Sequence, residues 1–213
     1  MSMSDLSIRE LSEKFAEPTP TPGGGSASAL SASLAASLVS MVARITSEKR
    51  HEQDPDRASF MAEIADEADQ LRQELLELAD RDSEAYDQVV AAMRMPKETD
   101  EDEQSRHEAI QAAFKTATEI PHRIAQVCAK VLELAERAVQ RGIRAGLSDA
   151  ATAAELAEAS LHSALLTMDI NLKSVEDERY RNVYHNKVVH LGKQARERKD
   201  AVLAIAEDWI RPE

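Results

Sequence analysis

Apolar residues recur at every third or fourth position along almost the whole chain, and this spacing is the period of the α-helix. No segment shows the alternation of polar and apolar residues that is typical of a strand. The sequence therefore predicts an all-α protein, an up-and-down or orthogonal bundle of long helices. We expect the helices at residues 5–16, 24–50, 56–94, 105–118, 121–141, 149–172 and 175–209, with an acidic solvated loop at 97–104.

Proline and glycine supply the breaks between these helices. Pro96 ends the third expected helix, and Pro121 suits the first turn of a new one. Gly142 and Gly146 mark the next break, because glycine commonly ends a helix. No internal repeat and no domain boundary is visible, so residues 1–213 are expected to form a single domain.

Composition limits the core and the partners. Only 3% of the residues are aromatic, so Ala, Leu, Val, Ile and Met must fill the core, and small side chains let helices pack closely. The net charge is −13 and no Lys/Arg cluster stands out. Nucleic acid and anionic membranes both require a basic surface, so neither is expected as a partner.

The single cysteine, Cys128, leaves no partner for a disulfide within the chain and suits a reducing compartment. Its spacing from neighbouring apolar residues is that of an ordinary core position, since free cysteine usually behaves as a small hydrophobic residue. No signal peptide opens the chain, and no run of about 20 apolar residues is present. We therefore expect a cytoplasmic protein without a membrane span.

Residues 18–29, PTPTPGGGSASA, carry three of the six glycines directly before a helix that is rich in Ala and Ser. The alternating prolines hold the chain extended. The exposed N–H groups of Gly23, Gly24 and Gly25 at a helix start can receive an anion or a carbonyl oxygen. A tight turn with a helix contact too close for a Cβ atom explains the glycines equally well, so both interpretations stay open.

Asp82 falls on a stripe that the helical period predicts to be buried. The stripe runs Leu71, Leu75, Leu78, Asp82, Tyr86, Val89, Met93, whereas Asp80 and Asp87 lie off it and look solvated. An unpaired buried carboxylate is costly or becomes protonated. Asp82 is therefore a candidate general acid or base. A buried Asp hydrogen-bonded to a neighbouring helix is the alternative.

Three further polar residues stand at notable positions. Ser148 or Asp149 can cap the helix expected at 149–172, and a cap is the simplest role for Asp149. Asn171 stands in an apolar run and could reach a buried partner. The six histidines are scattered and do not share helix faces with a set of ligands, so no metal site is expected.

Four segments resemble, in order and spacing, the blocks of the cyclodeaminase/cyclohydrolase family: PTPGGGSASALSASLAASLVSMVARIT, LADRDSEAYDQVVAAMRMPKETDEDEQSR, AIQAAFKTATEIP and SDAATAAELAEASLHSALLTMDINLKSVED. That family comprises the C-terminal domain of formiminotransferase-cyclodeaminase and stand-alone bacterial homologues, some of which are methenyltetrahydrofolate cyclohydrolases. The resemblance implies an all-helical homodimer that acts on a tetrahydrofolate derivative and uses no metal or redox cofactor.

The resemblance also implies roles for particular residues. The family's catalytic acid/base falls on Asp82 within DSEAY. Its glycine run falls on Gly23, Gly24 and Gly25 with Ser26, as substrate-binding residues. Its Ser-Asp pair falls on Ser148 and Asp149, and its late Asn falls on Asn171.

Two positions depart from the family pattern. Ile143 and Thr167 stand where the family often has Asn, so two amides are missing near the expected site. The chemistry leaves cyclodeamination and cyclohydrolysis both open. A non-catalytic helical module, for folate binding or oligomerisation, is the alternative, although a pure scaffold gives no reason for a carboxylate at Asp82.

Overall fold

The structure, a computed structural model, describes residues 2–211 and is helical throughout, as the sequence predicts. Six α-helices and two short 3-10 helices account for nearly all of this range. In chain order they are η1 (Met3–Asp5), α1 (Ile8–Ala16), α2 (Gly24–Arg50), α3 (Pro55–Met93), α4 (Asp100–Arg141), η2 (Arg144–Gly146), α5 (Leu147–Leu172) and α6 (Glu178–Ile210).

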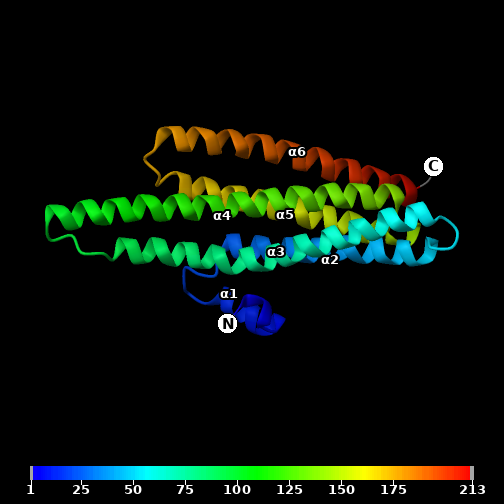
Figure 1. The fold of residues 1–213 in the computed structure, drawn as a ribbon, viewed down its shortest axis with the longest axis horizontal. Helices are drawn as coiled ribbons and strands as arrows, with labels where there is room; N and C mark the ends of the chain where they lie inside the picture. Colours follow the sequence, from blue (N-terminus) through cyan, green and yellow to red (C-terminus); the bar gives the residue numbers. More distant parts are fainter. Residues whose placement is uncertain (1, 212–213) are drawn as a thin grey trace.

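Helices α2 to α5 form an up-and-down bundle (Figure 1). Helix α6 lies on the outer side of α4 and α5, and α1 lies on the opposite side of the bundle, near α3. Hydrogen bonds show that α2 and α3 are antiparallel: Ser26 reaches the carbonyl of Ala79, and Ser47 reaches that of Ala58. Since α2 begins level with Asp82 while α3 continues to Met93, about 16 Å of α3 extends past the start of α2.

Small side chains fill much of the core, as the low aromatic content predicts. On α2 the fully buried residues include Ala29, Ala32, Ala35 and Ala36. Larger side chains such as Leu75 and Leu78 come from α3. Alanine faces bring helix backbones close together, and dense packing over the whole contact then supplies the stabilisation.

The prediction of two helices around Pro121 is wrong, because α4 runs through Pro121 without a break. Proline has no N–H, so the carbonyl of Ala117 loses its helical partner. The side-chain amide of Asn171 on α5 donates to that carbonyl at 2.6 Å. A neighbouring helix thus supplies the missing hydrogen bond, and the proline is tolerated inside α4.

The acidic loop expected at 97–104 is also largely helical, since α4 begins at Asp100. Thr99 accepts from the N–H of Asp102, and the Asp102 carboxylate accepts from the N–H of Thr99, which forms a capping box. Four acidic residues, 100–103, stand in the first turn. Negative charge at a helix N-terminus is favourable, so an acidic segment here starts a helix rather than a loop.

The break at Gly142 and Gly146 is confirmed, but α5 starts earlier than expected. Gly146 precedes its first residue, Leu147, and neither Ser148 nor Asp149 makes a side-chain cap. A Cβ atom on Gly146 would lie 3.0 Å from a methyl group of Val42, so a larger residue here would require the Val42 side chain of α2 to shift. Asp149 lies in the first turn of α5 instead.

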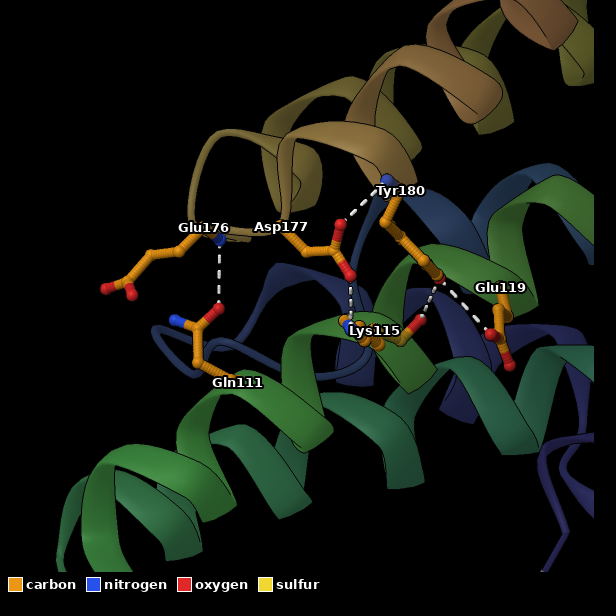
Figure 2. Close-up of polar contacts among 6 residues, drawn as sticks. All are labelled: Gln111, Lys115, Glu119, Glu176, Asp177 and Tyr180. Carbon is orange, nitrogen blue, oxygen red and sulfur yellow. Dashed lines mark hydrogen bonds and ion pairs between the residues drawn. The ribbon is translucent and has the colours of Figure 1, made fainter. Parts of the chain in front are cut away.

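The start of α6 is fixed on α4 by a group of polar contacts (Figure 2). Asp177 accepts from the N–H of Tyr180, which caps α6, and it also lies 3.0 Å from Lys115 Nζ. The Tyr180 hydroxyl donates to the carbonyl of Lys115 at 3.0 Å. Gln111 accepts from the N–H of Glu176 at 2.9 Å. The first turn of α6 therefore has a defined position.

Helix α2 is long and apolar enough to cross a membrane by length and composition, although it contains no uninterrupted run of about 20 apolar residues. However, 61% of the residues in that window are buried against the rest of the bundle. A core helix meets the same criterion, so this feature is weak support for a membrane span.

Candidate functional site

The glycine run forms the start of α2. Gly23 precedes the helix in an extended conformation and makes no side-chain cap. The first intrahelical bond at this end is donated by Ala27 to the carbonyl of Gly23. The N–H groups of Gly24, Gly25 and Ser26 therefore have no acceptor within the helix, which makes this end of α2 electropositive.

Asp82 on α3 lies directly against this helix start. A Cβ atom on Gly25 would lie within 2.5 Å of Asp82 Cγ, so the carboxylate occupies the space that any larger residue would fill. Ser26 Oγ lies 3.1 Å from Asp82 Oδ2. The glycine run thus makes the close helix contact that the sequence left open, and its role in receiving a ligand stays a prediction.

Burial raises the pKa of the Asp82 carboxyl above its usual value, and hydrogen bonding from the side chain and backbone of Ser26 acts in the opposite direction. A carboxyl shifted towards neutrality can accept a proton at one step of a reaction and donate it at the next. The environment of Asp82 is therefore suited to acid/base chemistry.

Ser83 is a member of this cluster that sequence reasoning missed. Its hydroxyl lies 3.1 Å from Ser26 Oγ, which also donates to the carbonyl of Ala79 at 2.8 Å. The Ser26 hydroxyl has one proton and the Ala79 carbonyl can only accept, so Ser26 bonds all three neighbours only when a protonated Asp82 and Ser83 both donate to it. The signal was available in the sequence, because Ser83 follows Asp82 directly.

The apolar stripe of α3 is only partly buried beyond Asp82. Leu78 is buried, but Tyr86 is 39% exposed and Met93 is 45% exposed, contrary to the prediction that both lie in the core. Val89, between them on the same stripe, is 1% exposed, so the core continues past Asp82 and only Tyr86 and Met93 reach the surface. Asp82 therefore lies one turn from an exposed residue of the same stripe, Tyr86.

Thr167 of α5 lies on the other side of the glycine run. A Cβ atom on Gly24 would lie 3.9 Å from Thr167 Oγ1. Of the two positions that depart from the family pattern, Thr167 thus borders the cluster around Asp82. Ile143 does not: its N–H donates to Thr46 Oγ1, towards the other end of α2.

Asn171 is buried in the same end of the bundle, where its amide is bonded to the carbonyl of Ala117. This contact is a sufficient structural reason for an asparagine at position 171, with no need for a ligand. Its expected substrate-binding role stays a prediction, and its observed contact is to α4.

Ser148 and Asp149 lie far from Asp82 in this chain. They are in the first turn of α5, and Thr167 is 19 residues, or about 28 Å, further along the same helix. The structure therefore brings Asp82, Ser26 and the glycine run together but does not bring Ser148 and Asp149 to them.

Asp80 and Asp87 differ from the expectation that they are simply solvated. Asp80 accepts from the N–H of Met3 at 2.9 Å and from the hydroxyl of Ser2 at 2.5 Å. Asp87 accepts from Thr21 at 3.3 Å. The N-terminal segment is thereby fastened to α3 beside the Asp82 cluster, although neither carboxylate points to Gly25.

Two other candidate chemistries find no support in the part of the chain that the structure describes. No group of three or more His, Cys, Asp or Glu side chains is placed to hold a metal ion within residues 2–211. Cys128 is fully buried, and burial raises the pKa of its thiol to about 12. A thiol in this environment is unreactive, as expected for a core residue.

Comparison with known proteins shows which family the chain resembles. A family described as formiminotransferase-cyclodeaminase matches residues 7–190. A methenyltetrahydrofolate cyclohydrolase of Methylorubrum extorquens is 36% identical over 173 residues, which are 81% of this chain and 82% of the relative. The formimidoyltransferase-cyclodeaminase of Gallus gallus is 33% identical over 87% of this chain but only 34% of its own length. This chain therefore spans about a third of that relative.

A solved structure shares the fold over its whole length. The formiminotetrahydrofolate cyclodeaminase of Thermotoga maritima superposes with a TM-score of 0.87 at 25% identity, and the match covers 98% of this chain and 99% of the other. The family match covers most of the chain, and the all-helical fold agrees with it. This protein therefore belongs to the formiminotransferase-cyclodeaminase family.

Proposed function

We propose that this protein is a tetrahydrofolate one-carbon enzyme that hydrolyses the 5,10-methenyl form, with Asp82 as the general acid/base. The observation that carries the proposal is the partly buried carboxyl of Asp82, with a raised pKa, against the start of α2. The similarity to a methenyltetrahydrofolate cyclohydrolase, over 81% of this chain and 82% of the relative, supports this choice of reaction.

The proposed reaction adds water to the methenyl carbon. The Asp82 carboxylate accepts a proton from the attacking water as the new C–O bond forms. The neutral carboxyl then donates a proton to N5 as the C–N5 bond breaks, and the adduct hydroxyl loses its proton to solvent. The product is the 10-formyl form, with one proton released overall. One group can serve both steps because its pKa is shifted towards neutrality.

Cyclodeamination is the second candidate, and the similarity to the cyclodeaminase of known structure favours it. In that reaction N10 attacks the formimino carbon, ammonia leaves, and the 5,10-methenyl form is the product. The proton taken from N10 and the proton delivered to the leaving nitrogen are within the capacity of the same carboxyl.

A single assay separates these possibilities. The purified protein is mixed in turn with 5,10-methenyl- and 5-formimino-tetrahydrofolate while the methenyl absorbance is followed. Accelerated loss of absorbance from the first substrate is the result that we expect. Gain of absorbance from the second would instead establish the deaminase, and no change with either would leave a non-catalytic folate-binding or oligomerisation module.

We also propose that the protein is a cytoplasmic homodimer, that residues 1–213 act as one domain, and that catalysis needs no cofactor beyond the folate substrate. An apolar stripe along the outer side of α2 supports self-association: Leu34 is 62% exposed, Met41 38% and Ile45 36%. Sedimentation at micromolar concentration tests the dimer, and a strict monomer would contradict it.

A further inference from the structure

A groove of about 730 Å³ lies between the last turns of α5 and the first turns of α6. Its apolar lining includes Leu166, which is 58% exposed, and Ile170, which is 66% exposed. Side chains of this size are usually covered, so the groove offers an apolar surface on which a flat ligand can rest.

The polar lining of the groove is mainly cationic. Its charged side chains are Lys173, Arg181 and a single carboxylate, Asp169, although the whole chain carries 39 acidic and 26 basic residues; Asn182 and His185 complete the polar lining. Within the described residues, Lys173 and His185 form no ion pair, and Arg181 comes only within 3.9 Å of Glu178. Cations that are not neutralised by close partners are available to an anionic ligand.

The cationic wall of the groove has a fixed position. Arg181 directly follows Tyr180, whose hydroxyl donates to the Lys115 carbonyl of α4 and whose backbone N–H donates to Asp177, itself paired with Lys115 (Figure 2). The Tyr180 ring also stacks on Tyr184 with a centroid distance of 4.5 Å, next to His185 in the chain. The groove is thus formed before any ligand arrives, which lowers the entropic cost of binding.

Helix α5 contributes residues both to the groove and to the border of the Asp82 cluster. Thr167 lies beside Gly24 at that cluster, Ile170 is one turn further on, and Lys173 lies about 9 Å beyond Thr167 along the helix. An elongated ligand with its reacting end at Asp82 can therefore pass Thr167 and place its other end in the groove.

We propose that this groove binds the carboxylate-bearing tail of the folate substrate, a deduction that rests on the proposed function. The p-aminobenzoyl ring lies on Leu166 and Ile170, and the glutamate carboxylates are held by Lys173 and Arg181. Arg181 is suited to bidentate contact with a carboxylate, and Lys173 acts as a point charge.

The test uses p-aminobenzoyl-triglutamate, a probe that lacks the pterin and the one-carbon group. Its Kd is measured by titration calorimetry for the wild type, Lys173→Gln, Arg181→Gln and the double variant. We expect each single variant to raise Kd about 5- to 10-fold, and the wild-type affinity to fall with salt. The matched control is Arg196→Gln, which removes a cation of α6 outside this groove and should leave Kd unchanged.

Kinetics and sedimentation complete the test. With a triglutamylated substrate, the same variants should raise KM and leave kcat unchanged. If the enzyme turns over but neither Kd nor KM changes in the Lys173 and Arg181 variants, the proposed binding of the tail in this groove is wrong and the proposed function is unaffected. Charge-dependent probe binding without any turnover would support the groove and refute the function. Dissociation of a dimer by the groove variants, with Kd unchanged, would identify a subunit contact and also overturn the proposal.

Discussion

Gly25→Ala should displace the Asp82 carboxylate while the bundle stays folded. The added Cβ atom would lie 2.5 Å from both Asp82 Cγ and Oδ2 and closer still to Oδ1. An unstrained contact needs about 3.5 Å, so the carboxylate must move by at least about 1 Å. The atoms that must move are the end of a short side chain rather than backbone, and Asp82 has open surface beyond it towards Tyr86.

The expected magnitudes differ for activity and stability. Moving a catalytic group by about 1 Å can lower turnover about 100-fold. Forcing Asp82 off its rotamer costs about 0.5–1.5 kcal/mol. Alanine is favoured over glycine by about 1 kcal/mol in a helix interior and by less in the first turn, where Gly25 lies, so the substitution offsets part of that cost. The free energy of unfolding should therefore change by no more than about 1 kcal/mol.

The assay follows the methenyl absorbance for turnover and thermal or urea unfolding for stability. Gly192→Ala is the control, because its Cβ atom would lie at an ordinary 3.6 Å from Leu165 in the interior of α6. That variant should keep its turnover and gain a little stability. If Gly25→Ala keeps normal turnover, or unfolds the protein, the inference that Gly25 makes room for Asp82 is wrong.

Three further substitutions test other parts of the structure. Asp80→Asn should leave turnover near normal and lower the free energy of unfolding by about 0.5–2 kcal/mol, because Asp80 anchors the N-terminal turn. If proteolysis of that turn is no faster in the variant, this role of Asp80 is wrong. Asn171→Ala should cost about 1–3 kcal/mol in urea unfolding, since it leaves the Ala117 carbonyl without a partner; an unchanged midpoint would count against that role. Burial lowers the pKa of His122 to about 4, so the unfolded state binds the proton more tightly and stability is lost as the pH falls from about 6.5 towards 4. His122→Gln should remove that part of the pH dependence, and an unaltered slope would refute it.

Helical periodicity predicted which parts of the chain are helical, and it placed the ends of α2 and α3 to within one residue. The span of α2 agrees residue for residue with the expectation, and α3 differs by one residue at each end. The expected helix at 5–16 is instead η1 and α1, because Ser7 caps α1 through a capping box with Glu10. These boundaries depend on single side-chain contacts that the period does not reveal.

Other features depend on contacts between helices and could not be predicted from the sequence. Pro121 looked like a helix start because its local effect is to break a hydrogen bond, and only the distant Asn171 restores that bond. Tyr86 stands on the stripe at a position that is typical of a core residue. Its exposure depends on how the neighbouring helices pack against that turn of α3, which the stripe does not reveal. The place of Ser148, far from Asp82, likewise follows from the antiparallel packing of α2 and α5.

The candidate site was predicted in its central part. A carboxylate on an apolar stripe led to Asp82, and a glycine run before a helix led to Gly25, but their direct contact appears only in the folded bundle. Ser83 was missed because serine occurs at many helix positions without any special role, whereas Thr167 was noted only as a departure from the family pattern.

The most direct test of the account is the turnover of Asp82→Asn on 5,10-methenyltetrahydrofolate, measured beside Asp80→Asn. Asparagine keeps the size and hydrogen-bonding capacity of Asp82 but cannot exchange a proton. The account predicts a folded protein that still binds folate and loses at least about 100-fold in kcat, whereas Asp80→Asn keeps near-normal turnover. Near-normal turnover in Asp82→Asn, or a large loss in Asp80→Asn alone, would contradict the assignment of the catalytic carboxylate.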